Sequence, residues 1–291
     1  MRIGVLGNPC SWHCDDLGRA ACKQGHEFFR IDFHRLIACV GLLSSPLAAE
    51  GEDLTAADAV VVRTMPPGSL EQVVFRMDSL ASLEASGVIV LNPPKAIECA
   101  VDKYLTLVRL QTAGLAVPET VVCENSESAM EAFQTLGGDV VVKPIFGSEG
   151  RGIIRVSDPE LALRTFRTLE RIQAILYVQR FIKHEGFDVR ALVLDGRVIG
   201  GMRRRSSDGF RTNISQKGIA EPYTLTDAEQ ECALLATKAT ASRFAGVDLL
   251  YDRQGHCYVI EVNAVPGWHA FHRVTGCDVA MLVIKSIEEW H

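Results

Sequence analysis

The sequence lacks the surplus of positive charge that nucleic-acid-binding proteins carry. Its 30 Lys and Arg residues are outnumbered by 36 Asp and Glu residues, and the formal net charge is -6. A protein that binds a polyanion mainly by neutralising phosphates needs the opposite balance. We therefore expect no nucleic-acid partner.

Long apolar segments are also absent. The longest apolar run, Leu36 to Leu43, is far shorter than the ~20 residues that cross a bilayer. The first ten residues, MRIGVLGNPC, contain no apolar region long enough for a secretory signal. These absences predict a cytoplasmic protein with no membrane partner.

Neither a disulfide framework nor a zinc-finger pattern is present. The nine cysteines are odd in number and scattered, which is typical of reduced, mostly buried thiols. Cys10 and Cys14 flank His13, but no second ligand pair at zinc-finger spacing accompanies them, so loop or helix-start residues are preferred. The first turn holds Gly4 and Gly7 without the third glycine and downstream acid of a dinucleotide fingerprint, which favours a plain strand-to-helix turn.

The apolar patterns that are present predict an N-terminal unit of alternating strands and helices. Residues 1–93 have the periodicity of an open parallel α/β domain. Neither proline of Pro93-Pro94 can donate a ladder hydrogen bond, so the pair suits a domain boundary. The expected strands are Arg2 to Leu6, Phe28 to Ile31, Ala59 to Arg63 and Val88 to Leu91, and the expected helices are Asp15 to Gln24 and Ser69 to Ala85.

Two further units follow. Residues 94–180 combine short strands and helices in a compact α+β unit around a glycine-rich turn. In residues 181–291, Asp195-Gly196 and Gln254-Gly255 are turn signals between alternating apolar runs, which predicts a largely antiparallel sheet. Two helices are expected to cover a face of that sheet, Asp227 to Phe244 and Asp278 to Trp290.

The segment from Val141 to Gly152 has the character of a phosphate-binding turn. It is a buried-type strand ending in Lys143, followed by a turn with three glycines. Glycines let backbone N–H groups approach an anion, and a lysine at the strand end adds a point charge. Lys143 precedes the glycines, so this is not a Walker A loop. Judged alone, an ordinary hairpin turn is an equally good interpretation.

Two apolar runs near the C-terminal end carry oxygen side chains that predict a metal site. In adjacent strands, Asp248 would lie opposite Glu261, with Asn263 on the same face, because side chains alternate with period two. Carboxylate and amide oxygens suit a hard divalent cation that also binds nucleotide phosphates. The alternative is a cross-strand acid satisfied by a nearby arginine.

Cations gather in one part of this acidic chain. Arginine forks recognise carboxylate and phosphate, so these residues would bind a triphosphate and an acidic amino acid as amine substrate, although a solvated loop is the alternative. Because only part of the Arg203–Arg205 triplet can point inward, we assign the solvated loop to Arg205 more readily than to Arg203. The full set is Arg190, Arg203, Arg204, Arg205, Arg211 and Lys217.

Short motifs follow one another along the chain in a specific order. They are Asp102-Lys103, Lys143-Pro144, Gly147 to Gly152, Tyr177 to Ile182, Asp188 to Arg190, Met202 to Arg204, Arg211 to Asn213, Asp248, Glu261 to Asn263 and Pro266-Gly267. Together they resemble ATP-grasp ligases of the RimK-type α-L-glutamate ligase group over nearly the whole chain. The resemblance implies an ATP-grasp fold with an N-terminal parallel α/β domain, a central lid subdomain and a C-terminal antiparallel-sheet subdomain.

The resemblance implies a site for ATP beneath the lid. Gln179, with the backbone of Phe181 and Ile182, would form the adenine-binding hinge. Asp188 would help to position the nucleotide. The remaining ATP contacts that it implies are Lys103, Lys143, Gly147, Ser148, Gly150, Arg151 and Gly152.

The resemblance also implies the catalytic and substrate-binding residues. Arg190 and Arg204 would face phosphate or an acyl-phosphate intermediate. Many relatives carry Arg at the position of Gln216, which leaves Lys217 as a substitute. Magnesium, or manganese in its place, would be held by Asp248, Glu261 and Asn263. The implied substrate contacts are Arg211, Asn213, Lys217 and Trp268, although a core or interface aromatic is the more common use of such a tryptophan.

The function implied by the resemblance is ATP-dependent carboxylate–amine ligation. Arg63 to Gln72 and Pro266 to Phe271 look most like ligases that add L-glutamate to a tetrahydromethanopterin-type pterin cofactor. The partners would then be a small carboxylate acceptor and L-glutamate, with homo-oligomerisation left open. The alternatives are a glutamate ligase acting on a protein tail or an amino-acid-carrier protein, and a non-catalytic ATP-binding scaffold.

Overall fold

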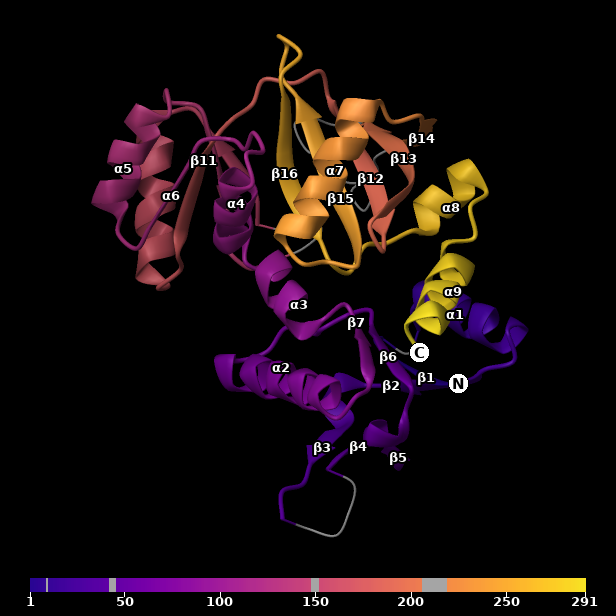
Figure 1. Cartoon of the computed structure of the whole chain (residues 1–291). Helices are drawn as coiled ribbons and strands as arrows, with labels where there is room; N and C mark the ends of the chain where they lie inside the picture. Colours follow the sequence, from indigo (N-terminus) through magenta and orange to yellow (C-terminus); the bar gives the residue numbers. More distant parts are fainter. Residues whose placement is uncertain (9, 42–45, 148–151, 206–218) are drawn as a thin grey trace.

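The computed structural model describes residues 1–8, 10–41, 46–147, 152–205 and 219–291. Three main sheets form an N-terminal domain at the bottom of Figure 1, a lid at the upper left and a large C-terminal sheet at the upper right. This arrangement confirms the expected combination of α/β and α+β architecture. Within the described part of the chain, no helix has the length and apolar character that a membrane span needs.

The N-terminal sheet is entirely parallel and has the order β2-β1-β6-β7. Helix α1 (Trp12–Lys23) packs on the face that carries Ile3 and Val61, whereas α2 (Leu70–Ala85) packs on the face that carries Val60 and Val62. The chain therefore changes sides between β1 and β6, and ligands of open α/β sheets bind outside the carboxyl ends of strands at such a point. The strands are β1 (Arg2–Leu6), β2 (Glu27–Ile31), β6 (Ala59–Val62) and β7 (Ile89–Leu91).

A small antiparallel ribbon was not predicted from the sequence. It consists of β3 (Leu36–Ala38), β4 (Leu47–Ala49) and β5 (Glu52–Asp53), flanked by the 3-10 helices η1 (Phe33–Arg35) and η2 (Leu54–Ala56). Strands of two or three residues are too short to show the period-two pattern by which strands are found.

The expected interruption at Pro93-Pro94 is the start of a helix. Pro94 is the first residue of α3 (Pro94–Val101), a position where the missing N–H is tolerated. Helix α4 (Lys103–Thr112) follows at once, and the Asp102 carboxylate caps it by accepting from the N–H groups of Tyr104 and Leu105.

The lid is an antiparallel sheet with the order β10-β9-β11-β8. Helices α5 and α6 enclose a core around Phe133, Phe166 and Leu176. The elements are β8 (Thr120–Cys123), α5 (Ser126–Thr135), β9 (Val140–Lys143), β10 (Ile154–Val156), α6 (Pro159–Arg171) and β11 (Leu176–Arg180).

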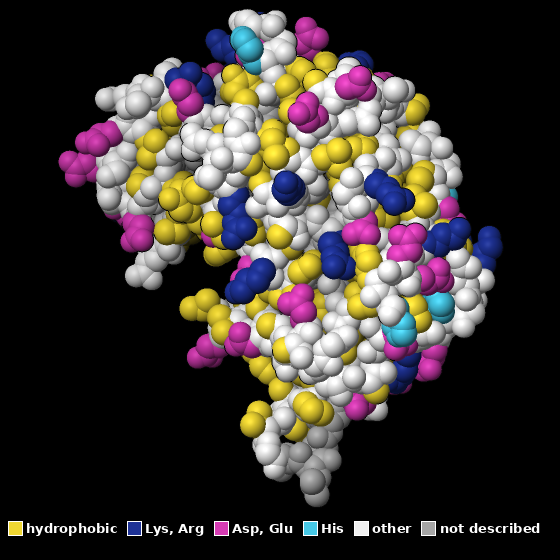
Figure 2. Space-filling view, in the orientation of Figure 1, with side chains coloured by type: hydrophobic (Ala, Val, Ile, Leu, Met, Phe, Trp, Pro, Cys, Tyr) yellow, Lys and Arg dark blue, Asp and Glu magenta, His cyan; other side chains and the backbone are white. Residues whose placement is uncertain are grey.

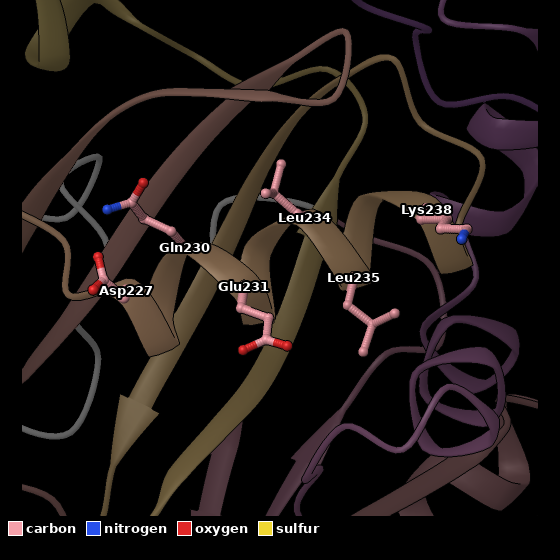
Figure 3. Close-up of a pocket in the computed structure, with 6 residues that line it drawn as sticks. All are labelled: Asp227, Gln230, Glu231, Leu234, Leu235 and Lys238. Carbon is pink, nitrogen blue, oxygen red and sulfur yellow. The ribbon is translucent and has the colours of Figure 1, made fainter.

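The C-terminal sheet is antiparallel, as predicted, with the order β14-β13-β12-β15-β16. Helix α7 (Asp227–Ala239) covers one of its faces (Figure 1). A shallow pocket of about 460 Å³ runs along the outer side of this helix (Figure 3). The strands are β12 (Phe187–Leu194), β13 (Arg197–Arg205), β14 (Ile219–Tyr223), β15 (Phe244–Tyr251) and β16 (Cys257–Asn263).

Two predictions about the C-terminal helices were wrong. Helix α7 ends at Ala239, because the chain turns at Ala241, which has a φ of 54°, and Phe244 instead opens β15. Helix α9 (Val279–Trp290), which was expected to cover a face of the C-terminal sheet, packs instead against α1 of the N-terminal domain (Figure 1). The short α8 (His269–Thr275), which was not predicted, leads into α9.

Asn92 joins the N-terminal domain to the C-terminal sheet. Its side chain is 1% exposed. The amide nitrogen donates to the carbonyls of Phe244 and Ala264, and Oδ1 accepts from the N–H groups of Arg243 at 2.8 Å and Phe244 at 2.9 Å. One buried side chain thus satisfies four backbone groups at the boundary.

We expect Asn92→Ala to lower the free energy of unfolding by about 2–4 kcal/mol, because it leaves buried backbone groups unsatisfied. Urea denaturation followed by circular dichroism measures the loss. Asn125→Ala, which removes the N-cap of α5, is the control and should cost about 1 kcal/mol. An Asn92→Ala loss no larger than this control would contradict the assigned role.

Candidate active site

One face of the C-terminal sheet carries the acids and arginines singled out in the sequence. The register pairs Asp248 with Glu261 and Gly246 with Asn263, as the alternation of side chains predicts. It also pairs Arg190 with Asp248 and Asp188 with Arg204. Paired residues in an antiparallel sheet point to the same side, so these groups share the face opposite α7.

Asp248 lies at the centre of a buried ion network. Arg190 approaches it through two hydrogen bonds of 2.6 and 2.7 Å, and Arg204 adds a contact of 2.8 Å. Arg204 in turn makes two 2.7 Å hydrogen bonds with Asp188. Asp188, Arg204 and Asp248 are all nearly fully buried. Every charge in the network therefore has an opposite charge at hydrogen-bonding distance.

The ion network controls the protonation of its members. Burial favours the neutral form of Asp248, but Arg190 and Arg204 outweigh it and hold the pKa of the carboxyl below its usual value. Burial likewise opposes the charge of Arg204, but Asp248 and Asp188 raise its pKa. Asp248 and Arg204 therefore remain charged at neutral pH, as bidentate arginine–carboxylate pairing requires.

The oxygen side chains beside this network fit a magnesium ion held together with nucleotide. The Glu261 carboxylate has no partner among the described residues, whereas Asn263 Oδ1 accepts from the N–H of Val265 at 2.8 Å. The described residues contain no group of three or more His, Cys, Asp or Glu side chains placed to hold a metal ion by themselves. Magnesium keeps waters and phosphates among its ligands, so an incomplete protein set suits it.

Lys143 extends from the lid toward this face. It is the last residue of β9, and its ammonium donates to Gln179 Oε1 at 2.7 Å. Gln179 is buried, and its amide nitrogen donates to the hydroxyls of Thr120 at 2.8 Å and Tyr177 at 3.2 Å. The side chain of Gln179 is thus committed to orienting Lys143, a role that the sequence did not indicate.

A second lysine lies beside the first. Lys103, at the start of α4, donates to the carbonyl of Gly147 at 2.8 Å. Burial lowers the pKa of Lys103, and it lowers the pKa of Lys143 to about 8. Glu261 opposes both shifts, and Lys103 adds to that of Lys143. Both lysines therefore feel the charge of Glu261, which brings the two phosphate-binding candidates and the metal-binding candidate into one site.

The expected hinge follows β11. The N–H of Phe181 donates to the carbonyl of Asp139 at 3.0 Å, and the Arg155 guanidinium lies 3.6 Å from the centre of the Phe181 ring. Ile182 is 9% exposed. Of the two backbone groups proposed for adenine, the N–H of Phe181 already has a partner.

Part of the predicted site lies outside the described residues. Gly147 and Gly152, at the two ends of the glycine-rich turn, are described and have φ angles of 149° and 74°, which favour glycine. The predicted residues that lie outside the described ranges are Ser148, Gly150, Arg151, Arg211, Asn213, Gln216 and Lys217.

Only the middle arginine of the Arg203–Arg205 triplet points inward. Arg204 points into the network, so Arg203 and Arg205 lie on the opposite face. The Arg203 guanidinium lies over the rings of Phe187 and Tyr223, and Arg205 Nε is 3.3 Å from Glu221. Arg203 thus takes part in packing and Arg205 in a surface ion pair. These two residues cannot be counted among surplus cations available to an acidic substrate.

Trp268 is a core residue in this structure. It is fully buried, and its indole N–H donates to the carboxylate of Asp16 at 2.9 Å. The ring packs with residues of both the N-terminal domain and the C-terminal sheet. The structure therefore agrees with the alternative of a core aromatic.

The architecture is that of the ATP-grasp fold. The structure is similar to that of the ATP-grasp ligase PsnB complexed with minimal precursor, Mg and ADP, with a TM-score of 0.77 and 21% identity over 99% of this chain and 96% of that chain. Figure 2 shows the indentation that separates the lid from the N-terminal domain.

The chain belongs to the RimK-like ATP-grasp family. The RimK PreATP-grasp domain matches residues 1–97, and the RimK-like ATP-grasp domain matches residues 100–287. It is 37% identical to the tetrahydromethanopterin:alpha-L-glutamate ligase of Methanosarcina acetivorans, over 99% of this chain and 98% of that protein. It is 31% identical to a probable alpha-L-glutamate ligase of Teredinibacter turnerae, over 99% of this chain and 96% of that protein. The chain is thus an ATP-dependent carboxylate–amine ligase.

The pKa of Lys143 predicts a pH dependence of ATP binding. The lysine is charged below about pH 8 and loses its proton above it, so its attraction for phosphate falls as the pH rises. We expect the Kd for ATP to rise about tenfold between pH 7 and pH 9. Lys143→Arg should flatten the profile, because arginine stays charged throughout. Titration calorimetry measures both, with exposed Lys238→Arg as the control. A pH-independent wild-type Kd would contradict the prediction.

Proposed function

We propose that the chain adds L-glutamate to a small carboxylate acceptor with ATP and Mg²⁺. The observation that carries this proposal is that Lys103 and Lys143 both lie close enough to Glu261 to feel its charge, and that Glu261 is paired with Asp248 of the buried ion network. Cations for phosphates and an oxygen ligand for a metal then lie beside arginines able to bind a carboxylate. The names of the two relatives supply L-glutamate as the amine.

The reaction needs positioned charges rather than a covalent nucleophile. An oxygen of the acceptor carboxylate attacks the γ-phosphorus of ATP, the bond to the β-phosphate oxygen breaks, and ADP leaves. The amine of glutamate then attacks the acyl carbon, phosphate departs, and the nitrogen loses a proton. Bound Mg²⁺ would neutralise charge on the transferring phosphoryl group. Lys143, held by Gln179, would stabilise the same charge.

The two arginines of the network have separate tasks. Arg204 is almost completely enclosed by Asp188 and Asp248, which makes it the member that holds the network together. Arg190 is more exposed, with a side-chain exposure of 12%. It would therefore be the arginine that reaches the reacting carboxylate or its acyl phosphate.

A tetrahydromethanopterin-type pterin is the acceptor that we propose. The support is the relative of that name, which is aligned over almost the whole of both chains at 37% identity. The sequence segments from Arg63 to Gln72 and from Pro266 to Phe271 also resemble those of ligases that act on such a pterin. A ligase acting on a protein tail would use the same chemistry with a different acceptor.

Glu261→Ala should abolish ATP-dependent ligation, with a loss of at least a hundredfold in kcat, because the proposed metal loses its free carboxylate. ADP release in the presence of Mg²⁺, glutamate and tetrahydromethanopterin measures the effect. Glu221→Ala removes the same charge from the opposite face of the sheet and serves as the control. Near-normal ADP release by Glu261→Ala would exclude the metal assignment.

The amine should be L-glutamate in preference to other amino acids. A site that recognises the side-chain carboxylate leaves charged donors unpaired when the amide replaces it, so we expect glutamine to be disfavoured about thirtyfold in kcat/KM. ADP release with glutamate, aspartate, glutamine and lysine is the comparison. A preference for glutamine or lysine would refute the donor, and turnover with a peptide tail alone would refute the acceptor.

A further inference from the structure

Arg63 lies at the carboxyl end of β6, where the N-terminal sheet changes sides. It follows β6 directly, and its backbone N–H donates to the carbonyl of Leu6 at the end of β1 at 2.7 Å. Gly7 is so close that a Cβ there would lie 3.1 Å from Arg63 Cβ. These are the two strands between which the sheet changes direction, and ligands of open α/β sheets bind outside such strand ends.

The charge of Arg63 has no acidic partner among the described residues. The side chain is 6% exposed. Its Nη2 donates to the carbonyl of Pro266 at 2.8 Å, and the guanidinium lies 4.3 Å from the centre of the Trp268 ring. Nε is buried without a hydrogen-bond partner. Of five N–H donors, the described structure thus occupies one.

Residues near Arg63 do not supply a negative charge. Burial, with the charges of Arg63 and His269, lowers the pKa of His13 to about 3, so this histidine is neutral at physiological pH. Its Nε2 accepts from the N–H of Trp268 at 3.1 Å. The carboxylate of Asp16 is engaged by the Trp268 indole and by Arg19.

Among the described residues, Arg63 lacks the carboxylate partners that Arg204 has. Both arginines are nearly fully buried, yet Arg204 has two carboxylates, which outweigh burial and raise its pKa. Burial lowers the pKa of Arg63 to about 10. A buried charge is costly unless an opposite charge accompanies it. An anionic ligand group would supply that charge for Arg63.

Arg63 is also close to the reacting groups. Pro266, whose carbonyl accepts from Arg63, lies over Gly246 on the catalytic face. A Cβ on Gly246 would be 3.2 Å from Pro266 Cβ and 3.4 Å from Arg190 Nε. Pro266 thus contacts Arg63 through its carbonyl and lies beside Gly246, next to Arg190.

We propose that Arg63 binds an oxyanion of the acceptor, a carboxylate or a phosphate, while the reacting carboxylate of the same molecule lies beside Arg190. The acceptor is therefore an acid with at least two anionic groups, and Arg63 selects it. This assignment rests on the proposed ligase function and adds a specificity residue in the N-terminal domain.

The matched control for Arg63 is Arg76, another buried arginine of the same domain. Arg76 is 4% exposed, and its Nη1 donates to the carbonyl of Pro66 at 2.7 Å. Arg63→Met and Arg76→Met each remove a buried guanidinium that binds the carbonyl of a proline. A purely structural role for Arg63 predicts the same behaviour for both variants.

The test is calorimetric titration of inorganic phosphate, glutarate and acetate into protein saturated with Mg²⁺ and a non-hydrolysable ATP analogue, whose three phosphates keep these anions from the nucleotide subsite. We expect phosphate or glutarate to bind wild type and Arg76→Met equally. Arg63→Met should bind it at least tenfold more weakly, and Arg63→Lys should fall between, because lysine keeps the charge without the bidentate fork. The preferred anion distinguishes a phosphate from a second carboxylate, and acetate measures binding of a single carboxylate.

Equal anion affinity of Arg63→Met and Arg76→Met, or no anion binding to wild type, would overturn the proposal. If Arg63→Met does not fold, a wild-type affinity in Arg63→Lys would also count against bidentate binding. The titration needs no turnover, so it separates this inference from the ligase function. With tetrahydromethanopterin as acceptor, Arg63→Lys should raise KM at least tenfold and change kcat much less, whereas absence of any ATP-dependent turnover in wild type would refute the ligase function instead.

Discussion

The double pairing of Asp248 with Arg190 and Arg204 is the interaction on which the catalytic face depends. A carboxylate that is 1% exposed could not remain ionised alone, and removing one partner from such a buried pair costs roughly 3–5 kcal/mol. The arginines come from β12 and β13, and Asp248 comes from β15, so the pairing ties three strands into one charged surface. Donors held in this way need no rearrangement when charge develops on a substrate, which is how electrostatic catalysis obtains its rate.

Four cations in and around the site fall into two groups. Arg204, which has acid partners, has a raised pKa, whereas Lys103, Lys143 and Arg63 have lowered pKa values because burial is not fully compensated. The second group comes from α4, the lid and the N-terminal domain, and it surrounds the catalytic face from separate elements. Anionic substrates would thus supply the compensating charges, and their binding would draw the lid and the two domains together.

Much of the fold could be predicted because strand and helix periods are visible in the sequence. The parallel order of the first domain and the register of Asp248 with Glu261 follow from period-two patterns, and the structure agrees with both. The direction of Arg203 and Arg205 could not be predicted, because three successive arginines carry no information on which one points inward. The domain against which α9 packs could not be predicted either, because the apolar face of a helix does not specify which domain it covers. The role of Gln179 required the three-dimensional pairing of β8, β9 and β11.

The return of α9 to the N-terminal domain has a consequence for the order of folding. Val283, Ile284 and Ile287 belong to the same core as Ile3 and Val5 at the beginning of the chain. During synthesis, the first domain therefore lacks part of its core until residues 279–290 have left the ribosome, although all its strands are already made. The core of the first domain is then completed only after β16, the last strand of the C-terminal sheet, has been made.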